Sequence, residues 1–134
     1  MGQADHSASG GGRRPQYGQR RDGRAQQRHP EGPLYGALDL GTNNCRLLIA
    51  RPYRSGFRVV SSYSKIVRLG EGLSESGRLS EAAMRRTIDV LKTCADKLQQ
   101  FGVKQSRIVS TEACRRADNC HEFLERVEAE TGLS

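Results

Sequence analysis

Apolar residues recur in a regular pattern only from about residue 34 onward, and that pattern begins with strands. Short runs rich in aliphatic and β-branched residues predict four strands, at residues 34–40, 45–51, 57–63 and 106–111. Ser55 and Gly56 supply a turn that allows the second and third runs to pair as a hairpin. The first three strands are therefore expected to be consecutive and antiparallel.

A period of three to four residues predicts a long helix between the third and fourth strands. We expect it over about 80–100, with Ser80 as its N-cap, Glu81 in its first turn and Gly102 as its stop. Its apolar face, which we expect to pack in the core, consists of Met84, Ile88, Leu91, Ala95, Leu98 and Phe101.

A shorter helix is expected near the end of the chain. Residues 112–118 read as a connector or short helical turn, after which the Asn119 side chain is expected to cap a helix that Gly132 ends. Glu122 stands at the third helical position, as in a capping box. The predicted order is β-β-β-α-β-α, an α/β fold. Because the last helix of such a fold normally leads to another strand, we expect a truncated chain or a fragment.

Residues 1–33 differ from the rest in composition. They contain no Leu, Ile, Val or Phe and carry six arginines against three acidic residues. Such a segment cannot bury enough apolar surface to offset its chain entropy, so we expect a disordered basic tail. Residues 34–134 then form an incomplete N-terminal domain with a small core.

The formal net charge of +7 favours anionic partners, such as nucleic acid, polyphosphate or nucleotides. A solvated, soluble tail is the alternative explanation for the basic residues within 1–33. Tyr17 is the only aromatic residue among them, so a stacking platform for bases is poorly supported and nucleic acid is not the expected partner.

No apolar run has the length of a signal sequence core or of a membrane span, so the expected location is cytoplasmic and no membrane partner is expected. The cysteines, Cys45, Cys94, Cys114 and Cys120, lack the spacing of a zinc site. We therefore expect reduced, structural thiols.

The connection between the first two strands, D-L-G-T-N-N, is longer than a tight hairpin needs. Asp39 ends the first strand, and Gly41 permits either a positive φ or a close backbone approach by a ligand. The amides of Gly41, Thr42, Asn43 and Asn44 can converge on an anion, and a carboxylate beside a phosphate suits Mg²⁺. On spacing alone the loop is also compatible with an ordinary hairpin turn.

The stretch ALDLGTNNCRLLIA resembles the first phosphate loop of the actin, Hsp70 and sugar-kinase ATPase superfamily. The later stretches RLGEGLSESGRLSEAAMRRTIDVLKTCADKLQQFGV and RIVSTEACRRADNCHEFLERVEAETGL resemble the Ppx/GppA family of exopolyphosphatases and guanosine pentaphosphate phosphohydrolases. That family carries a T-x-A-x-R-x-A-x-N block, represented here by Thr111, Ala113, Arg115, Ala117 and Asn119. The resemblance covers about 34–134.

This resemblance implies an RNase H-like fold with a mixed sheet and helices, and hydrolysis of phosphoanhydride bonds with Mg²⁺ as the usual cofactor. The implied substrates are inorganic polyphosphate, which loses its terminal phosphate, and pppGpp, which loses its 5′ γ-phosphate to give ppGpp. Polyphosphate or a guanosine penta- or tetraphosphate is accordingly the expected partner. A homodimer of the full-length protein is left open.

Carried over by resemblance, the loop residues Gly41, Thr42, Asn43 and Asn44 would bind phosphate, and Asp39 would bind the metal or its waters. Arg115 would bind substrate phosphate through its planar guanidinium. Thr42 keeps the hydroxyl of the family's usual loop serine. Asn44 replaces a second serine, which leaves that contact in doubt.

The resemblance also implies that catalytic parts of the family lie beyond Ser134. The catalytic glutamate, in a segment like S-x-x-E-E-A-R, and the second phosphate loop, like D-I-G-G-G-S-x-E, do not occur in this sequence. Glu112 does not match the catalytic position. No catalytic residue is therefore assigned, and the chain alone is expected to be inactive. The alternative function is a non-catalytic phosphate- or nucleotide-binding module of the same superfamily.

Overall fold

The computed structural model describes residues 32–110 and 112–134, so the tail predicted at 1–33 lies outside the described residues except for its last two. The strands are β1 (Tyr35–Leu40), β2 (Asn44–Tyr53), β3 (Gly56–Ile66) and β4 (Gln105–Ser110). They form one sheet in the order β3-β2-β1-β4. The first three strands are antiparallel, as predicted, whereas β4 lies parallel to β1. The sheet is therefore mixed.

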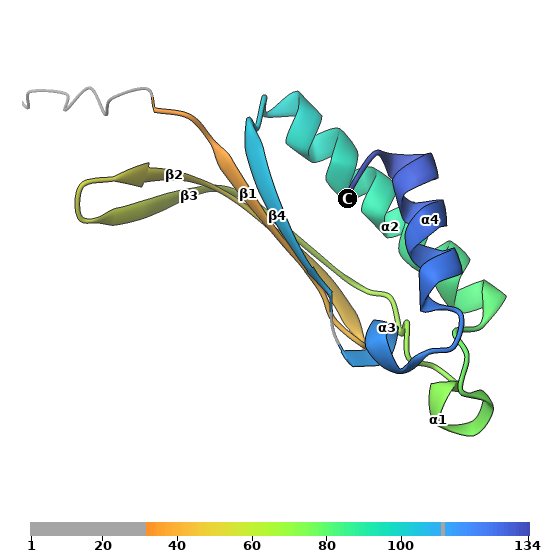
Figure 1. Ribbon diagram of the computed structural model, residues 1–134. Coiled ribbons are helices and arrows are strands. Elements are labelled where there is room, and N and C mark those ends of the chain that lie inside the picture. The colour runs from red at the N-terminus through yellow and green to blue at the C-terminus, as the bar shows by residue number, and fades with distance from the viewer. Residues whose placement is uncertain (1–31, 111) are drawn as a thin grey trace, which may run out of the picture.

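The helices are α1 (Leu73–Ser76), α2 (Glu81–Gln100), α3 (Glu112–Arg116) and α4 (Cys120–Thr131). The long helices α2 and α4 both lie on one face of the sheet (Figure 1). The order β-β-β-α-β-α is confirmed, with α1 and α3 as two short additional helices. β3 continues three residues beyond the predicted strand and stops at Ile66, and residues 67–72 form an irregular segment with turns at 69–72 that leads into α1.

Strict alternation along β1 and β2 builds the core. Leu38 and Leu40 of β1 face the helices, while Asp39 between them faces away. On α2, the predicted apolar face is buried at Met84, Ile88, Leu91 and Leu98. Phe101 was wrongly placed in this face: it is 36% exposed, because the helix ends at Gln100 and Gly102 turns the chain with φ of 62°.

The other face of the sheet is not covered by any helix of the described residues (Figure 1). Its exposed side chains include Tyr35 on β1 and Val109 on β4. The β2–β3 hairpin also projects past β1, because residues 51–53 of β2 pair only with β3. The Asp39 side chain belongs to this open face, since its neighbours along the strand are buried on the opposite side.

The two helix starts differ in how they are capped. The Ser80 hydroxyl accepts a hydrogen bond from the Ala83 N–H at 3.2 Å, which confirms the predicted N-cap of α2. Asn119 precedes α4 but makes no side-chain cap bond, so the predicted capping box with Glu122 is wrong. Instead the Asn119 amide group accepts from the Leu79 N–H at 2.8 Å and donates to the Leu79 carbonyl at 3.0 Å.

This exchange between Asn119 and Leu79 is buried, and it joins the start of α4 to the segment that enters α2. The backbone N–H of Asp118 adds a bond to the Gly77 carbonyl at 3.0 Å. A buried amide left without partners is costly, whereas this one satisfies two backbone groups at once. The asparagine of the T-x-A-x-R-x-A-x-N block thus makes a tertiary contact that joins the start of α4 to the segment before α2.

We expect Asn119→Ala to lower the free energy of unfolding by about 1–3 kcal/mol, because it leaves both Leu79 backbone groups without their partner. Urea denaturation followed by circular dichroism measures the change. Glu122→Ala is the matched control and should cost well under about 1 kcal/mol, since Glu122 is exposed and closes no capping box. A larger loss for Glu122→Ala than for Asn119→Ala would contradict the tertiary role of Asn119.

Candidate phosphate-binding site

The parallel pairing of β1 with β4 brings the two sequence motifs to one end of the sheet. Leu40, the last residue of β1, lies opposite Ser110, the last residue of β4. The loop 41–44 and helix α3 therefore follow the strands at the same end of the sheet, where β1 and β4 finish (Figure 1). Side chains that follow the carboxyl ends of neighbouring parallel strands commonly form a ligand site.

The loop is closed by its own backbone. The Gly41 N–H donates to the Asn44 carbonyl at 2.7 Å, so this amide, which we expected to face an anion, is already engaged. The φ of Gly41 is not positive either. Glycine is needed for another reason: a Cβ at this position would lie 2.9 Å from the Asn44 carbonyl oxygen. The close approach is therefore within the loop.

The remaining loop carbonyls point toward the segment after β3. The Thr42 carbonyl accepts from the Gly70 N–H at 3.1 Å, and the Asn43 carbonyl accepts from the N–H groups of Val67 and Arg68 at 2.7 and 3.1 Å. Because a trans peptide group points its N–H opposite to its C=O, the N–H groups that follow these carbonyls face away from this segment. These are the amides of Asn43 and Asn44, and they form the donor side of the loop.

Arg86 of α2 binds residues 67–71, which include the residues that bind the loop 41–44. Its Nε donates to the Val67 carbonyl at 2.6 Å, and its Nη2 donates to the Arg68 carbonyl at 3.3 Å. Nη2 also pairs with Glu71 at 2.9 Å. Arg68 itself has a φ of 49°, a conformation that costs free energy in a non-glycine residue and persists only when its surroundings impose it. Sequence reasoning missed this support, because the contacts span 15 to 19 residues.

Asp39 presents its carboxylate on the open face of the sheet, next to the loop. Arg46 of β2 lies directly opposite it in the sheet register. Both line a shallow groove of about 440 Å³, together with Arg107 of β4 and hydroxyl groups of β3. Within residues 32–110 and 112–134, no ion pair engages the Asp39 carboxylate. The carboxylate is thus available to a cation from solvent.

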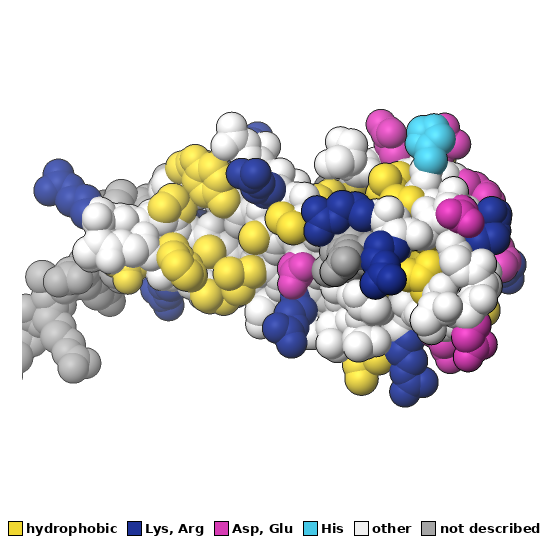
Figure 2. Space-filling model, turned by 60° about the horizontal axis from the view of Figure 1, so that its bottom comes forward, with side chains coloured by type: hydrophobic (Ala, Val, Ile, Leu, Met, Phe, Trp, Pro, Cys, Tyr) yellow, Lys and Arg dark blue, Asp and Glu magenta, His cyan; other side chains and the backbone are white. Residues whose placement is uncertain are grey.

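Arg115 is exposed on α3, at the same edge of the sheet as the loop. Figure 2, turned so that the lower end of Figure 1 comes forward, shows Lys and Arg side chains spread over this face, with most of the acidic side chains at its right end. Among the described residues, no hydrogen bond or ion pair joins Arg115 to the loop. Thr111, the first residue of the family block, lies outside the described residues.

The residues present fit a Mg²⁺ ion better than a softer metal. No cluster of three His, Cys, Asp or Glu side chains that could hold a metal occurs within the described ranges. Mg²⁺ is usually held by one or two carboxylates, with waters and substrate phosphates completing its shell. Asp39, a single carboxylate beside the D-L-G-T-N-N loop, fits that donor set.

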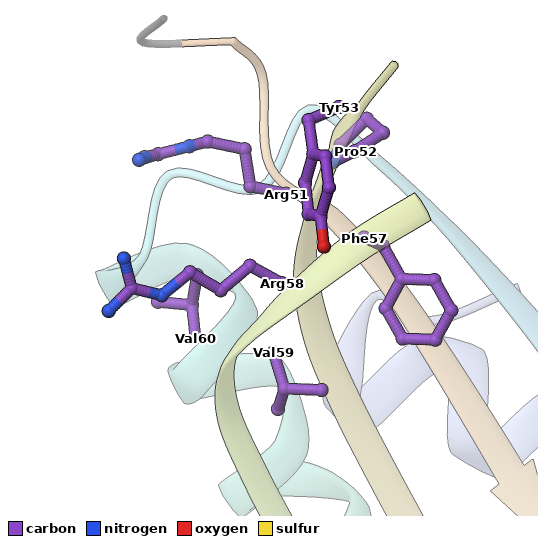
Figure 3. A pocket seen from close by; sticks show the side chains of 7 residues that line it. All are labelled: Arg51, Pro52, Tyr53, Phe57, Arg58, Val59 and Val60. Carbon is purple, nitrogen blue, oxygen red and sulfur yellow. The ribbon is translucent and has the colours of Figure 1, made fainter. Parts of the chain in front are cut away.

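A second hollow lies at the opposite end of strands β2 and β3. It measures about 620 Å³ and is lined by Arg51, Pro52, Tyr53, Phe57, Arg58, Val59 and Val60. Figure 3 shows Arg51 and Arg58 extending to one side of the hairpin and Phe57 to the other. The register puts this hairpin tip at the far end from Asn44 and Ile66, so it is remote from the loop 41–44.

Comparison with known proteins identifies the family of this chain. The family model described as the Ppx/GppA phosphatase family matches residues 48–134. The chain belongs to the Ppx/GppA phosphatase family. In the described part of this family member, no helix is both long and apolar enough to cross a bilayer.

Two curated relatives carry the name guanosine-5'-triphosphate,3'-diphosphate pyrophosphatase. The protein from Aeromonas hydrophila is 40% identical over 96 residues, which cover 72% of this chain and 19% of the relative. The one from Photobacterium profundum is 37% identical over 100 residues, covering 75% of this chain and 20% of the relative. This Ppx/GppA chain thus spans about a fifth of the length of these relatives.

Solved structures confirm the fold. The Ppx/GppA family member from Aquifex aeolicus matches with a TM-score of 0.73 and 38% identity, over 75% of this chain and 33% of that one. An exopolyphosphatase from Cytophaga hutchinsonii matches with a TM-score of 0.72 and 27% identity, over 75% and 32% of the two chains. The predicted α/β class, with a mixed sheet and helices, is the fold of this family.

We expect Gly41→Ala to destabilise the loop 41–44, because the added methyl group meets the Asn44 carbonyl oxygen rather than a movable side chain. The free energy of unfolding should fall by about 1–3 kcal/mol, as for other overpacked sites. Gly32→Ala is the control, since a Cβ there meets nothing within 4 Å. Thermal unfolding of both variants measures the difference; equal melting temperatures would refute the steric requirement at Gly41.

Proposed function

We propose that this chain supplies the first phosphate loop of a hydrolase that cleaves a terminal phosphoanhydride bond in inorganic polyphosphate or pppGpp. The observation that carries the proposal is the convergence of the D-L-G-T-N-N loop and the Arg115 segment at one end of the sheet. It is supported by membership of a family whose relatives are named as a pyrophosphatase acting on a guanosine derivative and as an exopolyphosphatase.

In this proposal the loop and Arg115 hold substrate phosphate from two sides. The donor side of the loop offers the amides of Asn43 and Asn44 and the polar side chains of Thr42, Asn43 and Asn44. Arg115 offers a planar guanidinium, which binds two phosphate oxygens in a bidentate manner. Gly41 contributes by permitting the tight loop closure and not through its engaged amide.

Asp39 is proposed to hold Mg²⁺, directly or through bound water. The ion, when bound, would neutralise charge on the phosphate oxygens as the anhydride bond breaks. Phosphoryl transfer depends mainly on such positioning and charge stabilisation. Arg46 and Arg107, which share the groove with Asp39, add positive charge along the approach to the loop. No residue of this chain is proposed as the general base.

The phosphate contact of Arg115 can be tested by calorimetric titration of the 134-residue chain with tripolyphosphate and Mg²⁺. Arg115→Gln should weaken binding by about 10- to 100-fold, corresponding to a lost charge-assisted contact of about 1.5–3 kcal/mol. Arg85→Gln removes the same charge from the exposed surface of α2 and should change the affinity little. Equal effects of the two substitutions would argue for a purely electrostatic attraction.

The role of Asp39 can be tested in a protein that contains this chain and has the full length of its Ppx/GppA relatives. Asp39→Asn should lower phosphate release from polyphosphate or pppGpp by about 100-fold or more at saturating Mg²⁺, since a charge-stabilising group is lost. Asp89→Asn, on the exposed side of α2, is the control for loss of one carboxylate. A rate near that of the unsubstituted protein, with an unchanged dependence on Mg²⁺, would remove Asp39 from the metal site.

The second candidate function is a phosphate- or nucleotide-binding module without hydrolysis. It is favoured by the presence of one D-L-G-T-N-N loop and by the lack of an assigned general base in this sequence. This second function would be supported if a protein with the full length of its Ppx/GppA relatives bound tripolyphosphate through Arg115 but released no phosphate. Selective binding of ATP over polyphosphate would favour the chaperone-like branch of the superfamily.

A further inference from the structure

Two pairs of neighbouring cysteines occur in the described part of the chain, and the pairs differ in access to solvent. Cys45 of β2 and Cys94 of α2 are both fully buried in the core. Cys114 of α3 belongs to the same core, and Cys120 at the start of α4 packs against that core where α3 and α4 contact each other. The nearness of the Cys120 thiol contributes to the raised pKa of Cys114. Cys114 is 1% exposed, whereas Cys120 is only partly buried. Of these two pairs, the second therefore offers a thiol to small molecules in solvent.

The backbone around the second pair is firmly held. The Cys120 N–H donates to the Ala117 carbonyl at 3.1 Å, which closes the turn between α3 and α4. The Asp118 N–H donates to the Gly77 carbonyl. The Asn119 side chain accepts a hydrogen bond from the Leu79 N–H and donates one to the Leu79 carbonyl. These bonds hold the backbone of Cys120 in place at the turn between α3 and α4.

The two thiols of this pair are suited to different steps of an oxidation. Burial, reinforced by the neighbouring Cys120, raises the pKa of Cys114 to about 12, so that Cys114 stays protonated near neutral pH. A thiolate, not a thiol, attacks an oxidant. Cys120 is therefore the residue that reacts first, since it is accessible, and Cys114 is the residue that resolves the product.

We propose that Cys114 and Cys120 are an oxidisable dithiol that hydroperoxides convert to a disulfide, tying α3 to the start of α4. In the first step the Cys120 thiolate attacks the terminal peroxide oxygen; an S–O bond forms, the O–O bond breaks, and hydroxide (alkoxide from an alkyl hydroperoxide) leaves and takes up a proton to form water (or the alcohol). In the second step the Cys114 thiol passes its proton to the sulfenic acid oxygen as its sulfur attacks the Cys120 sulfur. The S–S bond forms, the S–O bond breaks and the oxygen leaves as water. Two electrons pass from the two sulfurs to the peroxide.

The disulfide would restrain the five residues between the two sulfurs, 115–119, and among them Arg115. Cross-linking a short segment limits the open states that allow amide exchange. A consequence for phosphate binding rests on the function proposed for Arg115. The oxidation itself does not, so it can be tested whether or not the chain binds phosphate.

The sequence offers a direct test by peptide mapping. Trypsin cleaves after Arg115 and Arg116, so Cys114 and Cys120 fall in separate peptides, 108–115 and 117–126. The folded 134-residue chain is treated with hydrogen peroxide, unfolded with an alkylating agent present and digested. We expect these two peptides to appear joined, and to separate on reduction, while the peptides of Cys45 and Cys94 appear alkylated. The intact chain should lose two hydrogen atoms.

Two variants and a second measurement complete the test. Cys120→Ser should abolish the joined species, and Cys94→Ala, which removes a thiol of the other pair, should leave it in place. Hydrogen exchange of residues 115–119 should slow on oxidation of the unsubstituted chain and stay unchanged in Cys120→Ser. Over-oxidised Cys120 with alkylated Cys114, a link to Cys45 or Cys94, or a link between two chains would overturn the proposal. Unchanged exchange in the cross-linked chain would overturn the restraint of α3.

Discussion

The backbone clamp between the loop 41–44 and residues 67–70 is the constraint on which the proposed site depends. It binds the carbonyls of Thr42 and Asn43 from one side, so the amides that follow them are directed to the other. Arg86 binds the carbonyls on the far side of the clamp and links it to α2. Without these bonds the sequence D-L-G-T-N-N would be an ordinary connection between two strands. With them, it has one face of acceptors satisfied internally and one face of donors.

The alternation of side chains along β1 places core residues on one face of the sheet and the candidate metal ligand on the other. Leu38 and Leu40 anchor the strand in the core under α2 and α4, while Asp39 between them stands on the open face. A shift of the strand register by one residue would bury the carboxylate and expose both leucines. The hydrophobic core thus fixes the position of the candidate metal ligand, and the neighbouring arginines of β2 and β4 are placed by the same registers.

The sequence was sufficient for features that are local. Period-two runs located the strands, and the three-to-four period located α2 with its cap at Ser80, because these patterns reflect contacts between near neighbours. Phe101 was misplaced because a helical stripe does not show where the helix stops contacting the core.

Long-range contacts were the ones that sequence reasoning missed. The Asn119 side chain had a local option, capping α4, and a distant one, pairing with Leu79 forty residues away; only the structure reveals that the distant option wins. Arg86 likewise looks like any exposed helical arginine. The reason for Gly41 was misjudged because the group that approaches it belongs to its own loop.

The parallel pairing of β1 with β4 also has a kinetic consequence. β1, β2 and β3 are joined by short connections, so their loop-closure entropy is small and they can pair early. β4 reaches β1 only after the intervening hairpin and α2 have been spanned, which makes it the most distant pairing in the sheet. The loop with Asp39 and the segment with Arg115 therefore belong to different stages of folding. A chain that has formed the β1–β3 meander but has not docked β4 lacks one of the two segments of the proposed site.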